Sequence, residues 1–144
     1  MLKKKVNKRG NFVVLTVSFL ILCIVGIYII VKPCVINYGI SEYYTQKEMD
    51  EAIKLIKDEF YSWEGCKLYS IDYTSDELCK KELEYCNTLA DDEILYDECI
   101  VFRTEFRSPV FGGGAWNANY RYDWKWYLAR TNNGSWKLLT WGMP

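Results

Sequence analysis

The sequence predicts an α+β domain behind an N-terminal transmembrane helix. The segment Phe12–Val31 contains no charged residue and no proline. As a helix it would span about 30 Å, which matches the hydrocarbon core of a bilayer. Beyond it, apolar residues recur at helical or strand spacing in the order helix, strand, helix and three strands. That order favours helices that cover one face of a mostly antiparallel sheet.

Basic residues precede the apolar segment, and only Lys32 borders its far side. The positive-inside bias therefore predicts a cytoplasmic N-terminus and an exported C-terminal part. The expected organisation is a cytoplasmic basic tail (1–11), a signal-anchor helix (12–31), a stalk (32–44) and an extracytoplasmic domain (45–144). We expect a single-pass protein of the cell membrane whose partner is the bilayer. The residues that determine this orientation are Lys3, Lys4, Lys5, Lys8 and Arg9.

Two alternatives compete with the anchor, namely a cleaved signal peptide and a buried core helix. A signal peptide has an apolar region of about 7–15 residues and a cleavage site with small residues. This apolar run is longer, and no alanine precedes Ala52. A soluble core helix would need a polar face, which Thr16, Ser18 and Cys23 do not provide.

Charge and composition exclude several function classes. All 19 acidic residues lie at or after Glu42, and 12 basic residues follow Lys32, so the exported part carries 12 − 19 = −7. This balance argues against nucleic-acid binding, which needs clustered lysine and arginine. The chain has no histidine, so it lacks the usual general base and the commonest transition-metal ligand. We therefore expect no metal site and no cofactor.

Four cysteines fall within the expected domain, namely Cys66, Cys79, Cys86 and Cys99. Buried free thiols and disulfides both remain open, and four cysteines allow three pairings. Cys79 and Cys86 lie seven residues apart on a predicted helix. They would be separated by about 10 Å along its axis, which is too far for a bridge between them.

Local signals define the first elements of the domain. Thr45 and Glu48 form a capping-box pattern ahead of apolar residues at helical spacing, which predicts a helix over 46–62. Alternation predicts a strand over 66–73, and helical spacing predicts a second helix over 76–89. An apolar run over 99–106 predicts the next strand.

The strongest periodic signal follows a long glycine-containing connection. Aromatic and apolar residues alternate with polar ones over the nine residues from Tyr120 to Leu128, so one face of this strand is almost entirely aromatic. Asn133-Gly134 is typical of a hairpin turn before a last strand over 136–141. A two-residue turn there would place Trp126 opposite Trp141 and Leu128 opposite Leu139.

Three short motifs carry a resemblance to a known family: Trp63–Cys66, Asp123–Leu128 and Trp136–Gly142. With the expected curved sheet over a helix, residues 44–142 resemble small uncharacterised bacterial exported domains of the cystatin-like, nuclear transport factor two-like superfamily. The resemblance implies a cystatin-like fold and export, and it implies no particular activity, because this fold hosts both enzymes and binding proteins.

We expect a non-enzymatic binding or interaction domain with an unidentified protein or small-molecule partner. The candidate ligand-binding residues are Trp116, Tyr120, Tyr122 and Trp124, although a core role explains the same aromatic strand. One alternative is a small pocket enzyme that uses an aspartate such as Asp123 with tyrosines. Another is an acidic inhibitor or immunity-type protein that masks a basic partner.

Overall fold

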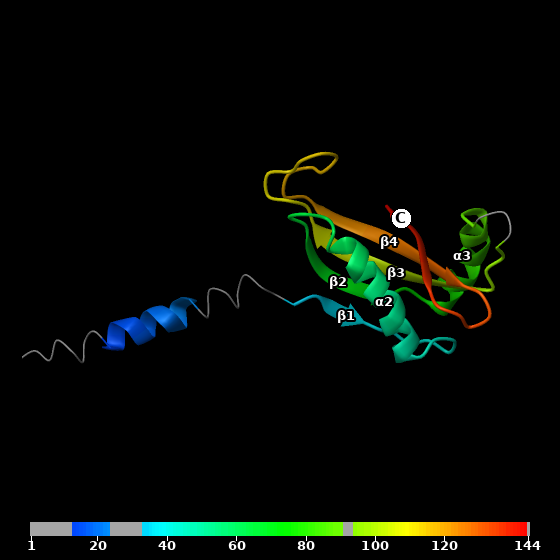
Figure 1. Cartoon of the computed structure of the whole chain (residues 1–144), viewed down its shortest axis with the longest axis horizontal. Helices are drawn as coiled ribbons and strands as arrows, with labels where there is room; N and C mark the ends of the chain where they lie inside the picture. The colour runs from blue at the N-terminus through cyan, green and yellow to red at the C-terminus, as the bar shows by residue number, and fades with distance from the viewer. Residues whose placement is uncertain (1–12, 24–32, 91–93, 144) are drawn as a thin grey trace, which may run out of the picture. The chain divides into compact units, whose positions relative to one another are not determined.

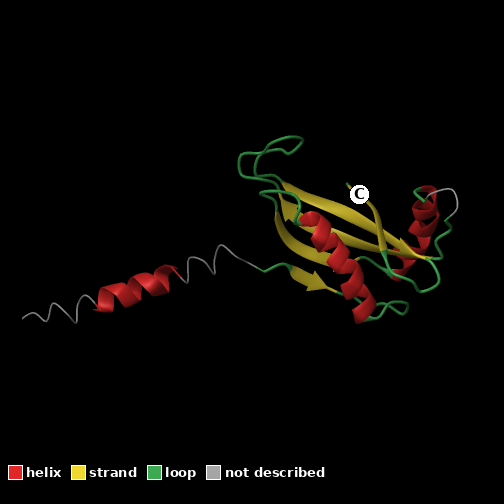
Figure 2. Cartoon of the chain, viewed as in Figure 1, coloured by secondary structure: helices red, strands yellow, loops and turns green. Residues whose placement is uncertain are grey.

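The computed structural model describes residues 13–23, 33–90 and 94–143. The chain divides into two compact units, Met1–Pro33 and Cys34–Pro144. Figure 1 shows the second unit as a twisted sheet with helices packed against it. Figure 2 shows the same elements by type.

The first unit contains one described helix, which covers residues 13–23. At about 1.5 Å per residue, the described residues of this helix rise about half of a ~30 Å hydrocarbon core. Within the described ranges, no helix is both long enough and apolar enough to cross a membrane. This finding contradicts the predicted transmembrane helix of residues 12–31. The signal anchor, the single-pass membrane localisation and the exported placement that depended on that helix are therefore wrong. Residues 12 and 24–31 and the basic residues of the tail lie outside the described part of the chain.

The second unit combines two helices with a five-stranded sheet. Its elements are β1 (Val35–Asn37), α2 (Gln46–Phe60), β2 (Lys67–Tyr73), α3 (Asp76–Thr88), β3 (Glu98–Arg107), β4 (Arg121–Arg130) and β5 (Lys137–Gly142). The two helices and the last four strands agree with the predicted elements to within a few residues. The α+β class of this unit thus follows from the sequence pattern.

The strand order is β1-β2-β3-β4-β5, and the sheet is mixed rather than wholly antiparallel. The strands β2 to β5 pair in antiparallel fashion, whereas β1 runs parallel to β2, with Ile36 opposite Ile71. This segment falls within the predicted stalk of residues 32–44. Three residues are too few to show a period of two, so the pattern carried no signal for β1.

Helix α2 begins as its sequence predicts. The Thr45 hydroxyl accepts a hydrogen bond from the Glu48 amide (3.3 Å), and the Glu48 carboxylate accepts one from the Thr45 amide (2.9 Å). This reciprocal pair satisfies two backbone donors that the helix cannot satisfy itself. The buried face of α2 consists of Met49, Ala52, Ile53, Ile56 and Phe60. We call the sheet face under α2 the inner face.

Helix α3 lies against the opposite face, which we call the outer face. Its buried residues Cys79 and Cys86 contact β3 at Val101 and Cys99. Successive strand residues point to opposite faces, so these two β3 residues lie on the other side from Phe102 and Phe106. The expectation that both helices share one face is therefore wrong. The Ser75 hydroxyl caps α3 by accepting a hydrogen bond from the Leu78 amide (3.2 Å).

The aromatic strand β4 supplies the centre of the core. Trp126 is fully buried, and its ring stacks on Trp63 and Trp141 with both centroid distances at 5.3 Å. Its indole N–H donates a hydrogen bond to the buried Thr104 hydroxyl on β3 (2.8 Å). An indole can be buried at low cost only when this donor is satisfied. The core interpretation of the β4 aromatic face therefore holds at Trp126.

The β4–β5 hairpin confirms one predicted pair and corrects the other. Trp126 lies opposite Trp141 as expected, but a bulge between Tyr127 and Leu128 places Leu128 opposite Leu138. The turn is centred on Asn132 (φ 50°) and Asn133 (φ 54°) rather than on Asn133 and Gly134. Asparagine tolerates positive φ, so it fills both central positions of the turn.

Replacing Trp126 with alanine should reduce the free energy of unfolding by about 3–5 kcal/mol, as truncation of a buried aromatic residue does. The change removes two ring stacks and leaves the buried Thr104 hydroxyl without its donor. Chemical denaturation of the full chain measures this loss. Lys125→Ala, one residue away on the outer face, serves as the matched control and should change stability by less than about 0.5 kcal/mol. Equal stability of both variants would contradict the core role of Trp126.

Candidate functional site

A pocket of about 590 Å³ opens at one end of the sheet, where the starts of α2 and α3 meet the start of β3 and the end of β4. Its volume lies within the roughly 300–1,000 Å³ that is usual for small-molecule sites. Charged and aromatic side chains dominate its walls. The lining residues are Tyr43, Tyr44, Glu48, Asp76, Cys79, Lys80, Leu83, Asp97, Glu98, Cys99, Arg130 and Asn133.

Arg130, the last residue of β4, lies at the base of this pocket and is only 5% exposed. Its Nη2 donates to Glu48 Oε1 (2.7 Å) and to Glu98 Oε2 (2.6 Å), and its Nε donates to Glu98 Oε2 (2.8 Å). The guanidinium carbon lies 4.2 Å from the centre of the Trp136 ring. A buried cation requires such partners, because its desolvation is costly. Arg130 thereby joins β4 to α2, to β3 and to the segment before β5.

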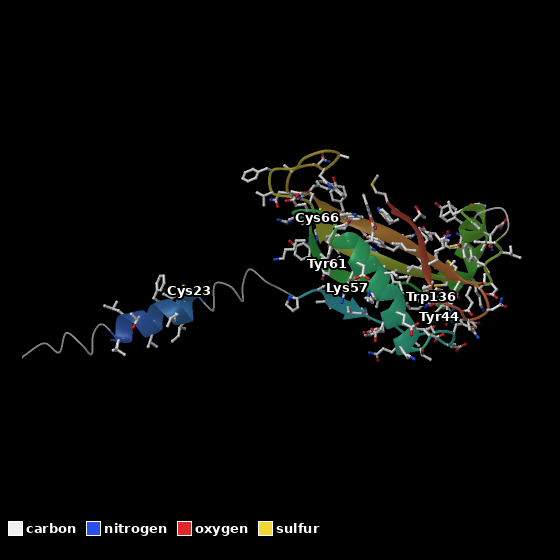
Figure 3. The ribbon with its side chains drawn as sticks, viewed as in Figure 1. Cys23, Tyr44, Lys57, Tyr61, Cys66 and Trp136 are labelled. Carbon is white, nitrogen blue, oxygen red and sulfur yellow. The ribbon has the colours of Figure 1, made fainter. Side chains whose placement is uncertain are left out.

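The capping box holds Glu48 where Arg130 can reach it. The hydrogen bond from the Thr45 amide, then that from Arg130 and then that from the Thr45 hydroxyl lower the pKa of Glu48 to about 2. Trp136 also holds the first turn of α2 in place, because its indole N–H donates a hydrogen bond to the Glu48 carbonyl oxygen (3.1 Å). Figure 3 shows Trp136 and Tyr44 close together beside α2, and their ring centroids lie 5.7 Å apart. Glu48 is therefore an ionised, positioned carboxylate.

The opposite wall is built around Asp76 in the first turn of α3. Its carboxylate accepts hydrogen bonds from the Ser41 hydroxyl (2.6 Å), the Tyr73 hydroxyl (2.6 Å) and the Glu42 amide (2.8 Å). Desolvation acts to raise the pKa of Asp76, but these hydrogen bonds outweigh it and the net shift is downward. A carboxylate at this end of a helix is also favoured by the helix dipole. Asp76 is thus held in its ionised form.

Lys80 lies one turn further along α3. Its ammonium group donates to the Tyr43 hydroxyl and lies 4.2 Å from the centre of the Tyr43 ring. The hydrogen bond with Tyr43 raises the pKa of Lys80, so the side chain stays protonated. An aromatic face attracts a cation through the ring quadrupole. The pocket therefore already holds two cations against aromatic rings, Lys80 on Tyr43 and Arg130 on Trp136.

Asp97 forms part of the rim of the pocket. Its carboxylate accepts hydrogen bonds from the Asn132 amide at 2.9 Å and 3.1 Å, which fixes it to the β4–β5 turn. Among the described residues that line the pocket there are four carboxylates, on Glu48, Asp76, Asp97 and Glu98, against the cations of Lys80 and Arg130. Four minus two leaves an excess of two negative charges. The site is electrostatically suited to a cationic group.

A second pocket of about 680 Å³ lies on the outer face, beyond α3, and includes Arg103, Asp123 and Lys125. Arg103 pairs with Asp123, and Arg121 nearby pairs with Glu105. The Arg103 side chain is 61% exposed, and exposed pairs of this kind contribute little. Asp123, the aspartate proposed for an enzyme, points to this face and away from the aromatic core. This pocket is less suited to ligand binding than the first one.

The four aromatic residues predicted to bind a ligand lie close together, away from the acidic pocket. Ring centroids lie 5.4 Å apart for Trp116 and Tyr122, 5.5 Å for Trp116 and Trp124, and 4.9 Å for Tyr120 and Tyr122. Three of them pack against the buried core, and Tyr120 is 54% exposed. Within the described part of the chain, the Trp124 indole nitrogen is buried without a hydrogen-bond partner. This aromatic cluster forms the partly buried edge of the hydrophobic core.

Sequence analysis missed Arg130 and the acidic pocket around it. A signal was present, because Arg130 continues the buried phase of β4 after Trp124, Trp126 and Leu128. A charged residue in a buried phase needs a charged partner, and Glu98 lies directly opposite it on β3. The local pattern at Glu48 predicts only a capping role. Asp97 had no comparable signal, since it precedes the strand.

Comparison with known proteins adds no relative. No family model matches the chain, and no curated protein or solved structure matches it. The resemblance to the cystatin-like superfamily therefore stays a prediction.

Replacing Glu48 with glutamine should destabilise the domain at neutral pH by about 1–3 kcal/mol, because Arg130 loses one of its charged partners. The pKa of Glu48 is about 2 in the folded domain, below the roughly 4.3 of an unfolded chain. The ionised Glu48 carboxylate therefore contributes fully to the free energy of unfolding above about pH 4.3, and this contribution is lost as the pH falls toward 2. Denaturant titrations between pH 7 and pH 3 should show a weaker acid dependence in Glu48→Gln. Asp58→Asn, on the exposed side of the same helix, should retain the parent profile.

Proposed function

We propose that this chain is a binding domain whose acidic pocket accepts a cationic group, such as the amine of a small molecule. The observation that carries the proposal is the excess of two negative charges in a pocket of about 590 Å³ that also presents tyrosine rings. Carboxylates and aromatic faces together form the usual recognition chemistry for ammonium and guanidinium groups. This proposal retains the non-enzymatic binding role expected from the sequence. It places the binding site in this pocket instead of on the aromatic strand.

The ionisation states of the pocket favour binding over catalysis. A general base works best when its pKa is close to the operating pH, and a nucleophilic lysine needs a lowered pKa. Here the pKa of Glu48 and that of Asp76 are lowered, and the pKa of Lys80 is raised. All three groups therefore keep a fixed charge around neutral pH. The enzyme alternative that uses Asp123 gains no support, because this residue is paired with Arg103 on the outer face.

A basic protein partner is the second candidate, and the charge of the domain favours it. The residues after Lys32 carry a net charge of −7, from 12 basic and 19 acidic residues. Such a charge accelerates encounter with a basic surface, whose lysine or arginine side chains could enter the same pocket. The inhibitor or immunity-type role predicts strong dependence on ionic strength and little affinity for free amines.

Two single substitutions with opposite expected effects test the pocket. Isothermal titration calorimetry of the full chain with spermidine, at constant ionic strength, measures the dissociation constant. Asp97→Asn removes one rim charge and should weaken binding about 5- to 10-fold. Lys80→Gln removes the competing cation over Tyr43 and should strengthen binding by a similar factor. General destabilisation of the domain cannot produce both shifts.

Asp123→Asn is the control, because it removes the same charge from the outer face. Its affinity for spermidine should stay within about twofold of the parent, since screening weakens charges more than a Debye length away. An uncharged analogue of similar length should not bind. Equal responses of Asp97→Asn and Asp123→Asn would show that net charge alone attracts the probe, and the pocket assignment would then fail.

A further inference from the structure

Three cysteines are buried between α3 and β3, and two of them, Cys79 and Cys99, also lie in the wall of the acidic pocket. Their exposed fractions are 2% for Cys79, 0% for Cys86 and 2% for Cys99. The Sγ atoms of Cys86 and Cys99 lie 2.9 Å apart, although the residues are 13 positions apart in the chain. The described cysteines are all free thiols. This close contact places two oxidisable groups directly against each other.

We propose that Cys86 and Cys99 are a disulfide-forming pair that joins the last turns of α3 to the start of β3. A disulfide bond is about 2.05 Å long, so the two sulfur atoms need to approach by only about 0.9 Å. Both residues already face each other across the same packed contact. Rotation about either Cα–Cβ bond moves Sγ without any displacement of the backbone. The inference is independent of the proposed ligand.

Cys79 is the obvious competitor, and its contacts exclude it as the favoured partner. Its sulfur accepts a hydrogen bond from the Val101 amide (3.3 Å), and its thiol lies 3.6 Å from the Tyr73 hydroxyl. The Tyr73 hydroxyl in turn donates to Asp76 (2.6 Å). Pairing of Cys79 with either neighbour would leave the Val101 amide without this acceptor. The sulfur atoms of Cys86 and Cys99, by contrast, contact each other at 2.9 Å.

The oxidant that we assign is a small-molecule disulfide, such as oxidised glutathione. The thiolate of one cysteine attacks a sulfur of this reagent, forms a mixed disulfide and releases one reduced thiol. The second cysteine then attacks the protein sulfur of the mixed disulfide and releases the second thiol. Two electrons and two protons pass from Cys86 and Cys99 to the reagent. One protein disulfide and two small thiols are the products.

Burial determines when this exchange takes place. The hydrogen bond with Cys86 and then desolvation raise the pKa of Cys99 strongly, so the docked thiol is a poor nucleophile. Exchange therefore proceeds while α3 is away from the sheet, as it is during refolding. Once α3 has docked, the same burial shields the bond from reductants. The docked pair should keep whichever redox state it had when the domain folded.

Peptide mapping of the full chain tests the pairing directly. The protein is refolded with oxidised and reduced glutathione, or with excess reductant, then unfolded, alkylated without further reduction and cut with trypsin. Residues 82–103 fall on one tryptic peptide that contains both Cys86 and Cys99, whereas Cys79 falls on the peptide of residues 68–80. The glutathione sample should yield peptide 82–103 without alkyl groups and lighter than its dithiol form by two hydrogen atoms. Two alkyl groups on this peptide, or its cross-linking to peptide 68–80, would overturn the proposal.

Thermal unfolding of the same samples provides a second measurement. Closing a loop of this length in the unfolded chain should raise the melting temperature of the oxidised protein by about 10 °C over the reduced protein. Cys86→Ser and Cys99→Ser should each abolish the difference, and Cys66→Ser should keep it as the matched control. If a serine variant fails to fold, the peptide map of the parent chain still decides the pairing. No difference between oxidised and reduced parent protein would contradict a bridge that spans α3 and β3.

Discussion

This end of the domain depends on the ion pairs that the buried Arg130 guanidinium makes with two carboxylates. The guanidinium is shared by Glu48 from α2 and Glu98 from β3, and it covers the Trp136 ring ahead of β5. A buried ion pair adds little net stability compared with apolar packing, but loss of one partner is costly. The pairing therefore specifies how the segments meet more than it adds to the free energy of folding. The acidic pocket exists because these segments are held at a fixed separation.

The fold was predictable where a pattern ran over many residues. The capping box at Thr45 and Glu48, the helical stripe behind it and the alternation along β4 each combine several agreeing signals, and the structure contains each of them. Sequence reasoning failed where context decided the outcome. The apolar run of 12–31 matches a membrane span by length, yet within the described part of the chain no helix is long and apolar enough to cross a membrane. Strand β1 is too short to show a period, and only its pairing with β2 reveals it.

The candidate site was harder to predict than the fold, since its residues come from distant parts of the chain. Glu48 and Arg130 are 82 positions apart, and Tyr44 and Cys99 are 55 apart. Local patterns assign a role to each residue within its own element, such as the cap for Glu48. These local patterns do not show which charged groups lie close together in the folded domain. The alternation of aromatic residues along β4 was a strong pattern and suggested a binding surface. The alternation instead arises because the hydrophobic core needs aromatic side chains on this face of the strand.

The two phases of β3 show how a single strand serves both faces of the sheet. Its inner phase begins with Glu98, the partner of Arg130, and is then apolar or neutral along Ile100, Phe102, Thr104 and Phe106, where the aromatic core covers it. Its outer phase begins with the buried Cys99 and Val101 and then changes to charged residues at Arg103 and beyond. Helix α3 contacts β3 at Cys99 and Val101, which lie in the first half of the strand. The outer face is therefore shielded from solvent under α3 and exposed to solvent beyond it. The buried cysteines lie in the part that α3 covers, and the surface ion pairs lie beyond it. The place where α3 packs therefore decides where each kind of chemistry occurs on this face.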